Sequence, residues 1–182
     1  TAATVAELVA INAATTGTPV LNAATNAANF SDTAANLTAG FLGTTSHTGT
    51  LTVTGAAATV AQANLLDAIT QGVVTATIEG DSAADLATLT GTTGVYTVVQ
   101  NGTVVATIAE LIAINAATTG GITINSNTIA NNYSDTAANL VAAFTGITTH
   151  TGTMTISGTT AATEAELLVI NAATAGAITL NA

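Results

Sequence analysis

One motif returns four times along the chain, and this repetition constrains the fold more than any other feature. It reads TVAELVAINAATTG at residues 4–17 and TIAELIAINAATTG at residues 107–120. Looser copies, TVAQANLLDAITQG and TEAELLVINAATAG, occupy residues 59–72 and 163–176. Segments that repeat in sequence are expected to repeat in structure and to pack against their neighbours. The sequence therefore predicts a repeat architecture.

Each copy of this first motif has the signature of a short capped helix. A Thr opens it and a Glu or Gln follows three residues later, which is the spacing of a capping box. Val5, Leu8 and Val9 supply an apolar stripe at helical spacing. A Gly closes each copy, where we expect the left-handed residue that ends a helix. The predicted cap residues are Thr4, Glu7, Gly17, Thr59, Gln62, Gly72, Thr107, Glu110, Gly120, Thr163, Glu166 and Gly176.

A second motif alternates with the first. It reads SDTAANL at residues 31–37 and 134–140, and GDSAADL at residues 80–86. An Asp followed by Thr or Ser and two alanines predicts a helix start. The predicted start residues are Asp32, Asp81 and Asp135.

The segments between these helices have the pattern of strands. Residues 50–55, 73–78, 122–125 and 153–158 alternate β-branched and polar side chains. Residues 96–105 contain an Asn-Gly pair flanked by valines, which predicts a hairpin.

The fold class expected from this order is α/β, with leucine-rich-repeat-like stacking of strand and short helix. The motifs begin near positions 4, 31, 59, 80, 107, 134 and 163, so one coil takes about 26 residues. We interpret residues 1–182 as a single solenoid segment. The alternative is a row of small α+β domains, each about 50 residues long. Such domains are marginal without disulfides or a metal, and the chain has no Cys.

A longer period is also present. Residues 160–182 restate residues 1–23 at an offset of 159 positions. Solenoids usually end in polar capping repeats, and neither of these segments is one. We therefore expect the chain to stack end to end with copies of itself, either in a covalent tandem array or as separate subunits.

The composition excludes several functions. The chain has no Lys, Arg or Cys and a net charge of −10. Phosphate clamps, catalytic lysines and thiol nucleophiles are therefore absent, and nucleic acid is not an expected partner. No uninterrupted apolar run of 18 residues occurs, so membrane insertion is not expected. Hydrophobic residues make up 48% but aromatic residues only 3%, which predicts a thin aliphatic core.

Among the acidic residues, Glu79, Asp81 and Asp85 form the best candidate Ca²⁺ site. Most of the other acidic residues are explained as helix-cap partners. The chain contains neither an EF-hand loop nor a Gly-Asp nonapeptide. We therefore expect no cofactor, with Ca²⁺ as the alternative.

The two histidines do not indicate catalysis. His47 and His150 each open an HTGT segment at equivalent places, which suggests a role in a turn. Four coils would separate them by about 19 Å, too far to share a metal. No G-x-S-x-G motif is present. We therefore expect that the protein is not an enzyme.

Two polar patterns repeat with the coils. Asn12, Asn115 and Asn171 recur at one place in the first motif and suggest a ladder of bonds to neighbouring backbone. Alternating threonines suggest hydroxyl rows on a strand face, a surface with good strand propensity that could also bind ice. These threonines are Thr50, Thr52, Thr54, Thr75, Thr77, Thr151, Thr153 and Thr155.

The alternating ELVAINAATTG and SDTAANL segments resemble very large repetitive bacterial surface proteins, including giant cell-surface and adhesin-like proteins of cyanobacteria and other aquatic bacteria. The resemblance implies an extracellular, cell-surface protein that forms layers, stalks, fibres or matrix. Many such proteins carry Ca²⁺-binding Gly-Asp repeats, which this chain lacks. The expected function is thus a structural extracellular repeat protein. The alternative is an adhesin-type module that binds Ca²⁺, a glycan or ice through its Thr-rich strand face.

Overall fold

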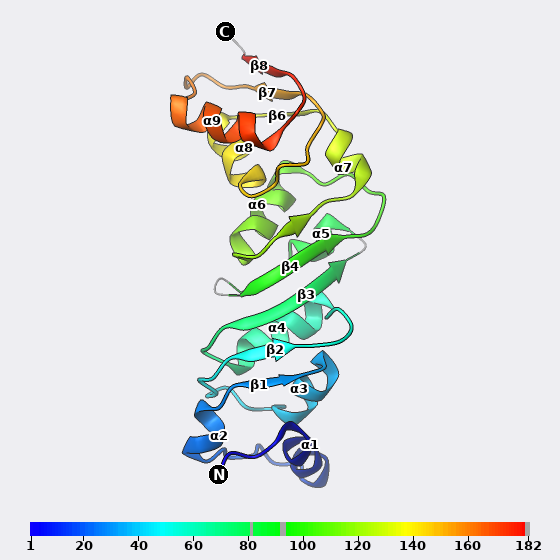
Figure 1. Cartoon of the computed structure of the whole chain (residues 1–182), viewed down its shortest axis with the longest axis vertical. Helices are drawn as coiled ribbons and strands as arrows, with labels where there is room; N and C mark the ends of the chain where they lie inside the picture. Colours follow the sequence, from blue (N-terminus) through cyan, green and yellow to red (C-terminus); the bar gives the residue numbers. More distant parts are fainter. Residues whose placement is uncertain (81, 92–93, 181–182) are drawn as a thin grey trace. The chain divides into compact units, whose positions relative to one another are not determined.

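The computed structural model describes residues 1–80, 82–91 and 94–180, and these form an α/β structure with parallel sheets (Figure 1). The chain divides into two compact units. Unit 1 comprises Thr1–Glu79, Leu89–Thr97 and Thr118–Gly120. Unit 2 comprises Gly80–Thr88, Val98–Ala117 and Gly121–Ala182.

Unit 1 alternates short helices with short parallel strands. Strands β1 and β2 pair in parallel, as do β2 and β3, so that Phe30, Leu51 and Val74 lie side by side. The elements are α1 (Val5–Ala14), α2 (Ala23–Ala27), β1 (Phe30–Asp32), α3 (Ala34–Gly40), β2 (Leu51–Val53), α4 (Val60–Ile69) and β3 (Val74–Gly80), together with the first half of β4 (Val95–Gln100).

Unit 2 repeats this plan. Strand β5 pairs in parallel with the second half of β4, and β7 lies in parallel between β6 and β8. The elements are α5 (Ala83–Leu86), α6 (Ile108–Ala117), β5 (Ile122–Thr123), α7 (Ser126–Ala130), β6 (Tyr133–Asp135), α8 (Ala137–Phe144), β7 (Met154–Ile156), α9 (Glu164–Ala173) and β8 (Ile178–Leu180).

Within each unit, helices of the two motifs pack alternately. We call α1, α4, α6 and α9 the first-motif helices, and α3, α5 and α8 the second-motif helices. The main helix contacts are α1 with α3 and α3 with α4 in unit 1, and α5 with α6, α6 with α8 and α8 with α9 in unit 2. Each of these contacts joins one helix of each kind.

The capping boxes form as their spacing predicts. At Thr4, Thr59 and Thr163 the hydroxyl accepts from the backbone N–H three residues on, and that residue's side chain accepts from the Thr N–H. The same two bonds join Thr107 and Glu110, at 2.7 and 3.2 Å. These bonds satisfy N–H groups that the first helical turn leaves without a partner.

The predicted helix starts at Asp32 and Asp135 are wrong by one residue. The N-caps are Thr33 and Thr136, whose hydroxyls accept from the N–H three residues on. The carboxylates act one position earlier. Asp32 Oδ1 accepts from Asn36 Nδ2 at 2.8 Å and from Thr33 N at 2.7 Å, and these bonds lower the pKa of Asp32. Helix α5 is capped by Ser82, and the predicted start at Asp81 lies outside the described residues.

The hairpin predicted over residues 96–105 is also wrong. Strand β4 takes up its first half, but residues 103–105 are not in a strand. Strand β4 lies between β3 and β5 in its sheet, so both of its edges are paired and no edge remains for a returning strand. The carbonyls of residues 103 and 104 accept from side-chain amides instead. Gln100 Nε2 donates to Val104 O at 2.9 Å, and Asn127 Nδ2 donates to Thr103 O at 2.6 Å.

Gly17, Gly72, Gly120 and Gly176 are not the left-handed residues predicted from their position. Among the described residues, positive φ is confined to Gly43, Gly55, Gly146 and Gly158. Helices α1, α4 and α9 instead end at Thr15, Thr70 and Thr174, which have extended backbone.

Close backbone approach explains three of these four glycines. A Cβ on Gly72 would lie 2.3 Å from Gly49 O, and one on Gly176 would lie 2.1 Å from Gly152 O. A Cβ on Gly120 would lie 2.2 Å from Tyr96 O. The two backbones therefore approach so closely at these points that only Gly fits.

We predict that Gly72→Ala destabilises the protein by about 2 kcal/mol or more, because the added methyl collides with a backbone carbonyl that cannot move aside. Gly121→Ala is the matched control, since a Cβ there meets nothing within 4 Å. Its free energy of unfolding should stay within about 0.5 kcal/mol of the parent value. Urea denaturation measures both, and equal effects would contradict the close-approach explanation.

Candidate functional site

The outer side of α1 carries side chains that no neighbouring helix covers in the described structure. Ile11 on this helix is 50% exposed, whereas its counterparts on the other first-motif helices are buried. Leu66 and Ile170 are 0% exposed and Ile114 is 2% exposed. The same side of the helix is therefore covered in three copies of the motif and open in one.

In each of the three copies, a second-motif helix covers this side of the first-motif helix. Helix α4 packs on α3, α6 on α5, and α9 on α8, so each is covered by the second-motif helix that precedes it in the chain. Helix α1 packs on α3 through its opposite side, where Val5 and Leu8 are buried.

The turn after α1 contains the same Thr and Gly that contact the preceding repeat in the other copies of the motif. In the other copies, a Thr hydroxyl at the helix end donates to a carbonyl of the preceding coil. These bonds are Thr70 to Gly49 O at 2.7 Å, Thr118 to Tyr96 O at 2.8 Å and Thr174 to Gly152 O at 3.0 Å. Among the described residues, no carbonyl accepts from the counterpart, Thr15, and a Cβ on Gly17 would meet only Thr15 Oγ1, at 3.6 Å.

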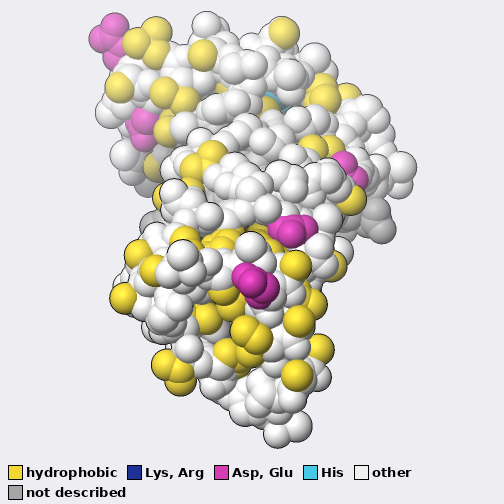
Figure 2. All heavy atoms as spheres, turned by 60° about the horizontal axis from the view of Figure 1, so that its bottom comes forward, with side chains coloured by type: hydrophobic (Ala, Val, Ile, Leu, Met, Phe, Trp, Pro, Cys, Tyr) yellow, Lys and Arg dark blue, Asp and Glu magenta, His cyan; other side chains and the backbone are white. Residues whose placement is uncertain are grey.

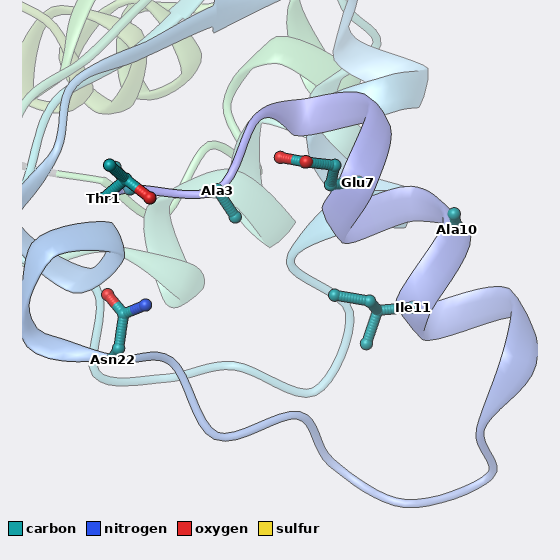
Figure 3. A pocket seen from close by; sticks show the side chains of 7 residues that line it. Thr1, Ala3, Glu7, Ala10, Ile11 and Asn22 are labelled. Atoms are coloured by element: carbon teal, nitrogen blue, oxygen red, sulfur yellow. The ribbon is translucent and has the colours of Figure 1, made fainter.

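A hollow of about 470 Å³ lies beside this face, between α1 and the segment that carries Asn22 (Figure 3). Ile11 and Glu7 of α1 line it together with Ala3. The Glu7 carboxylate accepts from Thr4 N at 2.7 Å and from Thr4 Oγ1 at 2.9 Å, and these bonds lower the pKa of Glu7. This carboxylate is therefore engaged as a helix cap.

Figure 2 is turned toward the end that carries α1 and shows hydrophobic side chains interspersed with polar atoms there, with acidic groups among them. We define the N-terminal face as Ile11, Ala14, Thr15 and Gly17, all of which are exposed. The counterparts of Ala14 on α6 and α9, Ala117 and Ala173, are buried.

Two of the three predicted Ca²⁺ residues, Glu79 and Asp85, lie in the described part of the chain. Among the described residues, no group of three or more His, Asp or Glu side chains lies close enough together to hold a metal ion. Asp85 lies in the first turn of α5, where its N–H donates to Ser82 Oγ at 3.1 Å. Glu79 lies at the exposed side of β3, and Asp81 is outside the described residues.

The two histidines are core residues rather than simple turn residues. His47 and His150 are 0% exposed. His47 Nε2 lies 3.0 Å from Ala28 O, so this nitrogen carries a proton and donates. His47 Nδ1 lies 3.0 Å from Thr70 Oγ1, the hydroxyl that also contacts Gly49 O.

His150 repeats this arrangement in unit 2. Its Nε2 lies 2.9 Å from Asn131 O and its Nδ1 lies 3.0 Å from Thr174 Oγ1. Burial lowers the pKa of both histidines. Aromatic rings surround them at matching positions, Phe30 and Phe41 around His47 and Tyr133 and Phe144 around His150. The equal sequence spacing of these aromatic residues from each His was the signal that could have revealed the buried clusters.

The third copy of this joint uses a Tyr. Tyr96 N donates to Thr118 Oγ1 at 2.9 Å, where the other two copies have a His ring. The Tyr96 hydroxyl is buried and has no hydrogen-bond partner among the described residues. Burial and the nearby Asp67 charge raise the pKa of Tyr96 to about 12, and burial also raises the pKa of Asp67.

The Asn ladder is present at two places. Asn12 Nδ2 donates to Gly40 O at 2.7 Å, and Asn115 Nδ2 donates to Thr145 O at 2.8 Å, so each ties a first-motif helix to the end of the next second-motif helix. Asn171 on α9 is exposed.

Across the described ranges, no helix is long and apolar enough to cross a membrane. No family model, no curated protein and no solved structure matches the chain. The features of the chain itself, its joints between coils and its N-terminal face, therefore carry the functional argument.

The buried histidines predict a loss of stability in mild acid. Because their pKa values in the folded protein lie below the ordinary 6.5, the unfolded chain binds more protons as the pH falls below 6.5. Stability should be full above pH 6.5 and decrease toward pH 5, by at most about 1.4 kcal/mol per pH unit for each His.

Urea denaturation at pH 7.5, 6.0 and 5.0 measures this slope. The variants His47→Gln and His150→Gln should each remove about half of it, whatever they do to stability at pH 7.5. An unchanged slope in both variants would show that other groups cause it.

Proposed function

We propose that the protein is a structural extracellular repeat protein that builds a fibre, surface layer or stalk by end-to-end stacking of copies, and that it is not an enzyme. The observation that carries the proposal is the exposure of Ile11 at a position that is buried in the other copies of the motif. An apolar side chain in a preformed interface is stabilised when a neighbour removes it from water.

The repeated joints support a solenoid arrangement of the coils. In both units parallel strands pair in register, and the same Thr, Gly and Asn contacts recur between successive coils. We propose that residues 1–182 form one solenoid segment in which each coil is stabilised by its neighbours. An isolated coil of this kind buries too little surface to fold alone.

The charge and composition fit an extracellular or cell-surface location. The chain has no Lys or Arg, so trypsin-like proteases find no cleavage site. Its net charge of −10 makes copies repel one another at low ionic strength. Salt screens this repulsion over about 10 Å at 0.1 M, so assembly by an apolar face is favoured in saline surroundings.

Assembly should therefore depend on protein concentration, on salt and on Ile11. We predict that light scattering shows growing particles as the salt concentration rises, and that electron micrographs show filaments or sheets. The variant Ile11→Ser should keep the fold, because the side chain is half exposed, and should assemble less.

The matched control is Ile114→Ser, in which the same change is made at a 2% exposed site. This variant should lose about 3 kcal/mol or more of folding stability. A parent protein that stays monomeric at all concentrations and salt levels would refute the proposed function.

A second function is favoured by one observation, the alignment of hydroxyl groups on the strands. Thr52 is paired in register with Ser31 and Thr75, and Thr155 with Ser134 and Thr179. Neighbouring strands lie about 4.8 Å apart, so each row is a regular array of hydroxyls that fits ordered water or a glycan. The row is absent from the β4–β5 pair, where Val99 lies beside Thr123.

Retention in slowly growing ice and binding to a glycan array test this second function, with Thr52→Val and Thr155→Val as variants. Loss of retention in these variants would support it. Absence of binding by the parent protein in both assays would exclude it and would leave the structural function unaffected.

A further inference from the structure

We propose that the Asn101-Gly102 pair is a self-modification site, at which the Asn101 side chain reacts with water in the folded protein and becomes Asp or isoaspartate. This Asn-Gly pair predicts a hairpin from the sequence, but it lies in an irregular segment directly after β4. The inference is independent of the proposed function, because it requires no second copy and no reagent other than water.

The step begins with attack by the backbone nitrogen of Gly102 on the side-chain carbon Cγ of Asn101. A bond forms between these two atoms, the bond from Cγ to Nδ2 breaks, and the proton of the Gly102 N–H leaves with the side-chain amine as ammonia. Water then opens the resulting five-membered imide ring. Opening at Cγ gives Asp, and opening at the backbone carbonyl carbon gives isoaspartate, in which the chain continues through Cγ. The sum is Asn plus water giving Asp or isoaspartate plus ammonia.

The Gly102 nitrogen is available for this attack. Its N–H has no hydrogen-bond partner among the described residues. Gly102 also has no Cβ that would shield the nitrogen from the neighbouring side chain. Asn101 itself is exposed, so water can reach the imide that forms there. The nucleophile, the accessible carbon and the water therefore meet at one place.

Hydrogen bonds hold the backbone on both sides of the pair. Asn101 N donates to Gly80 O at 2.9 Å. Three residues on, Val104 O accepts from Gln100 Nε2 and from Asn125 Nδ2, each at 2.9 Å. Isoaspartate adds one carbon atom to the backbone between these two fixed points. The isoaspartate product should therefore strain or break at least one of these bonds, whereas the Asp product should not.

The exposed asparagines before strands lack a free nucleophile. Asn29 Oδ1 accepts from Thr50 N at 2.9 Å, and the next nitrogen, that of Phe30, donates to Thr50 O at 3.0 Å. Asn132 repeats both bonds in unit 2. In these two places the side chain and the nitrogen that would attack it are both engaged.

Asn125 is the nearest competitor and supplies an internal control. It precedes Ser126, the first residue of α7, whose N–H has no partner within the helix. The Asn125 side chain is held, however, because Oδ1 accepts from Thr128 N at 2.8 Å and Nδ2 donates to Val104 O at 2.9 Å. Reaction at Asn125 would first have to break this helix cap.

Incubation of the folded full chain at pH 7.5, followed by peptide mass spectrometry, tests the proposal. Cleavage after Glu79 and Glu110 releases residues 80–110, in which Asn101 is the single Asn. We expect this peptide to shift with time to the mass of the Asp form, and fragmentation to show both Asp and isoaspartate at position 101. Each event should release one ammonia and add one negative charge to the net charge of −10, which anion exchange detects.

The same incubation in urea separates the contribution of the fold. In the folded chain Asn125 should stay intact while Asn101 reacts, and in the unfolded chain Asn125 should begin to react because its cap is lost. If Asn101 stays intact in the folded chain but reacts in urea, the folded segment blocks the attack and the proposal is wrong.

Two variants identify the attacking atom. Gly102→Ala should react several-fold more slowly, because its methyl group hinders approach of the nitrogen, and Asn101→Gln should release no ammonia. Urea denaturation of the fresh variants verifies that each is folded. Reaction of Gly102→Ala at the parent rate, or release of one ammonia per chain from Asn101→Gln, would overturn the assignment to this pair.

A comparison of the two products tests the effect on the backbone. Asp and isoaspartate chains carry the same charge and differ only in the extra backbone atom, so each is the matched control of the other. We expect the isolated isoaspartate form to unfold at a lower urea concentration than the Asp form. Equal midpoints would contradict the constraint that the bonds at Gly80 and Val104 impose.

Discussion

The rest of the structure depends on one contact, the close approach of the turns after α4, α6 and α9 to the backbone of the repeat before them. A Thr hydroxyl donates to a carbonyl of that repeat, and a Gly two residues on leaves room for the two backbones to lie together. The contact fixes the spacing of neighbouring coils without using charge. A chain without Lys or Arg has no side-chain ion pairs of the ordinary kind available, so hydrogen bonds and close packing must hold it together.

A local spacing in the sequence predicts structure best where it has one physical meaning. The Thr-to-Glu spacing of the capping box predicted all four first-motif helix starts, because only a helix brings those groups together. The glycines after these helices were misinterpreted because a Gly near a helix end has two uses, a left-handed turn or a close approach. Choosing between them requires the position of the neighbouring coil, which no local pattern contains.

The candidate site was predictable only in outline. The 159-residue offset predicts stacking of copies, but it does not show which side chains are exposed or that Ile11 differs so much from Ile114. The repetition of HTGT at equivalent places suggests a role in a turn for the histidines, whereas both are buried. Their burial follows from residues distant in sequence, since His47 bonds to Ala28 and Thr70 from two other coils. The hairpin prediction is wrong for a similar reason, because both edges of β4 are paired with strands from outside the predicted segment, β3 and β5.

The repetition of this turn contact has a mechanical consequence. Within the chain, the turns that contain Thr70, Thr118 and Thr174 are held by the same kind of hydroxyl-to-carbonyl bond beside a Gly. None of the three is built more weakly than the others, so under tension we expect the repeats to separate one at a time at similar forces.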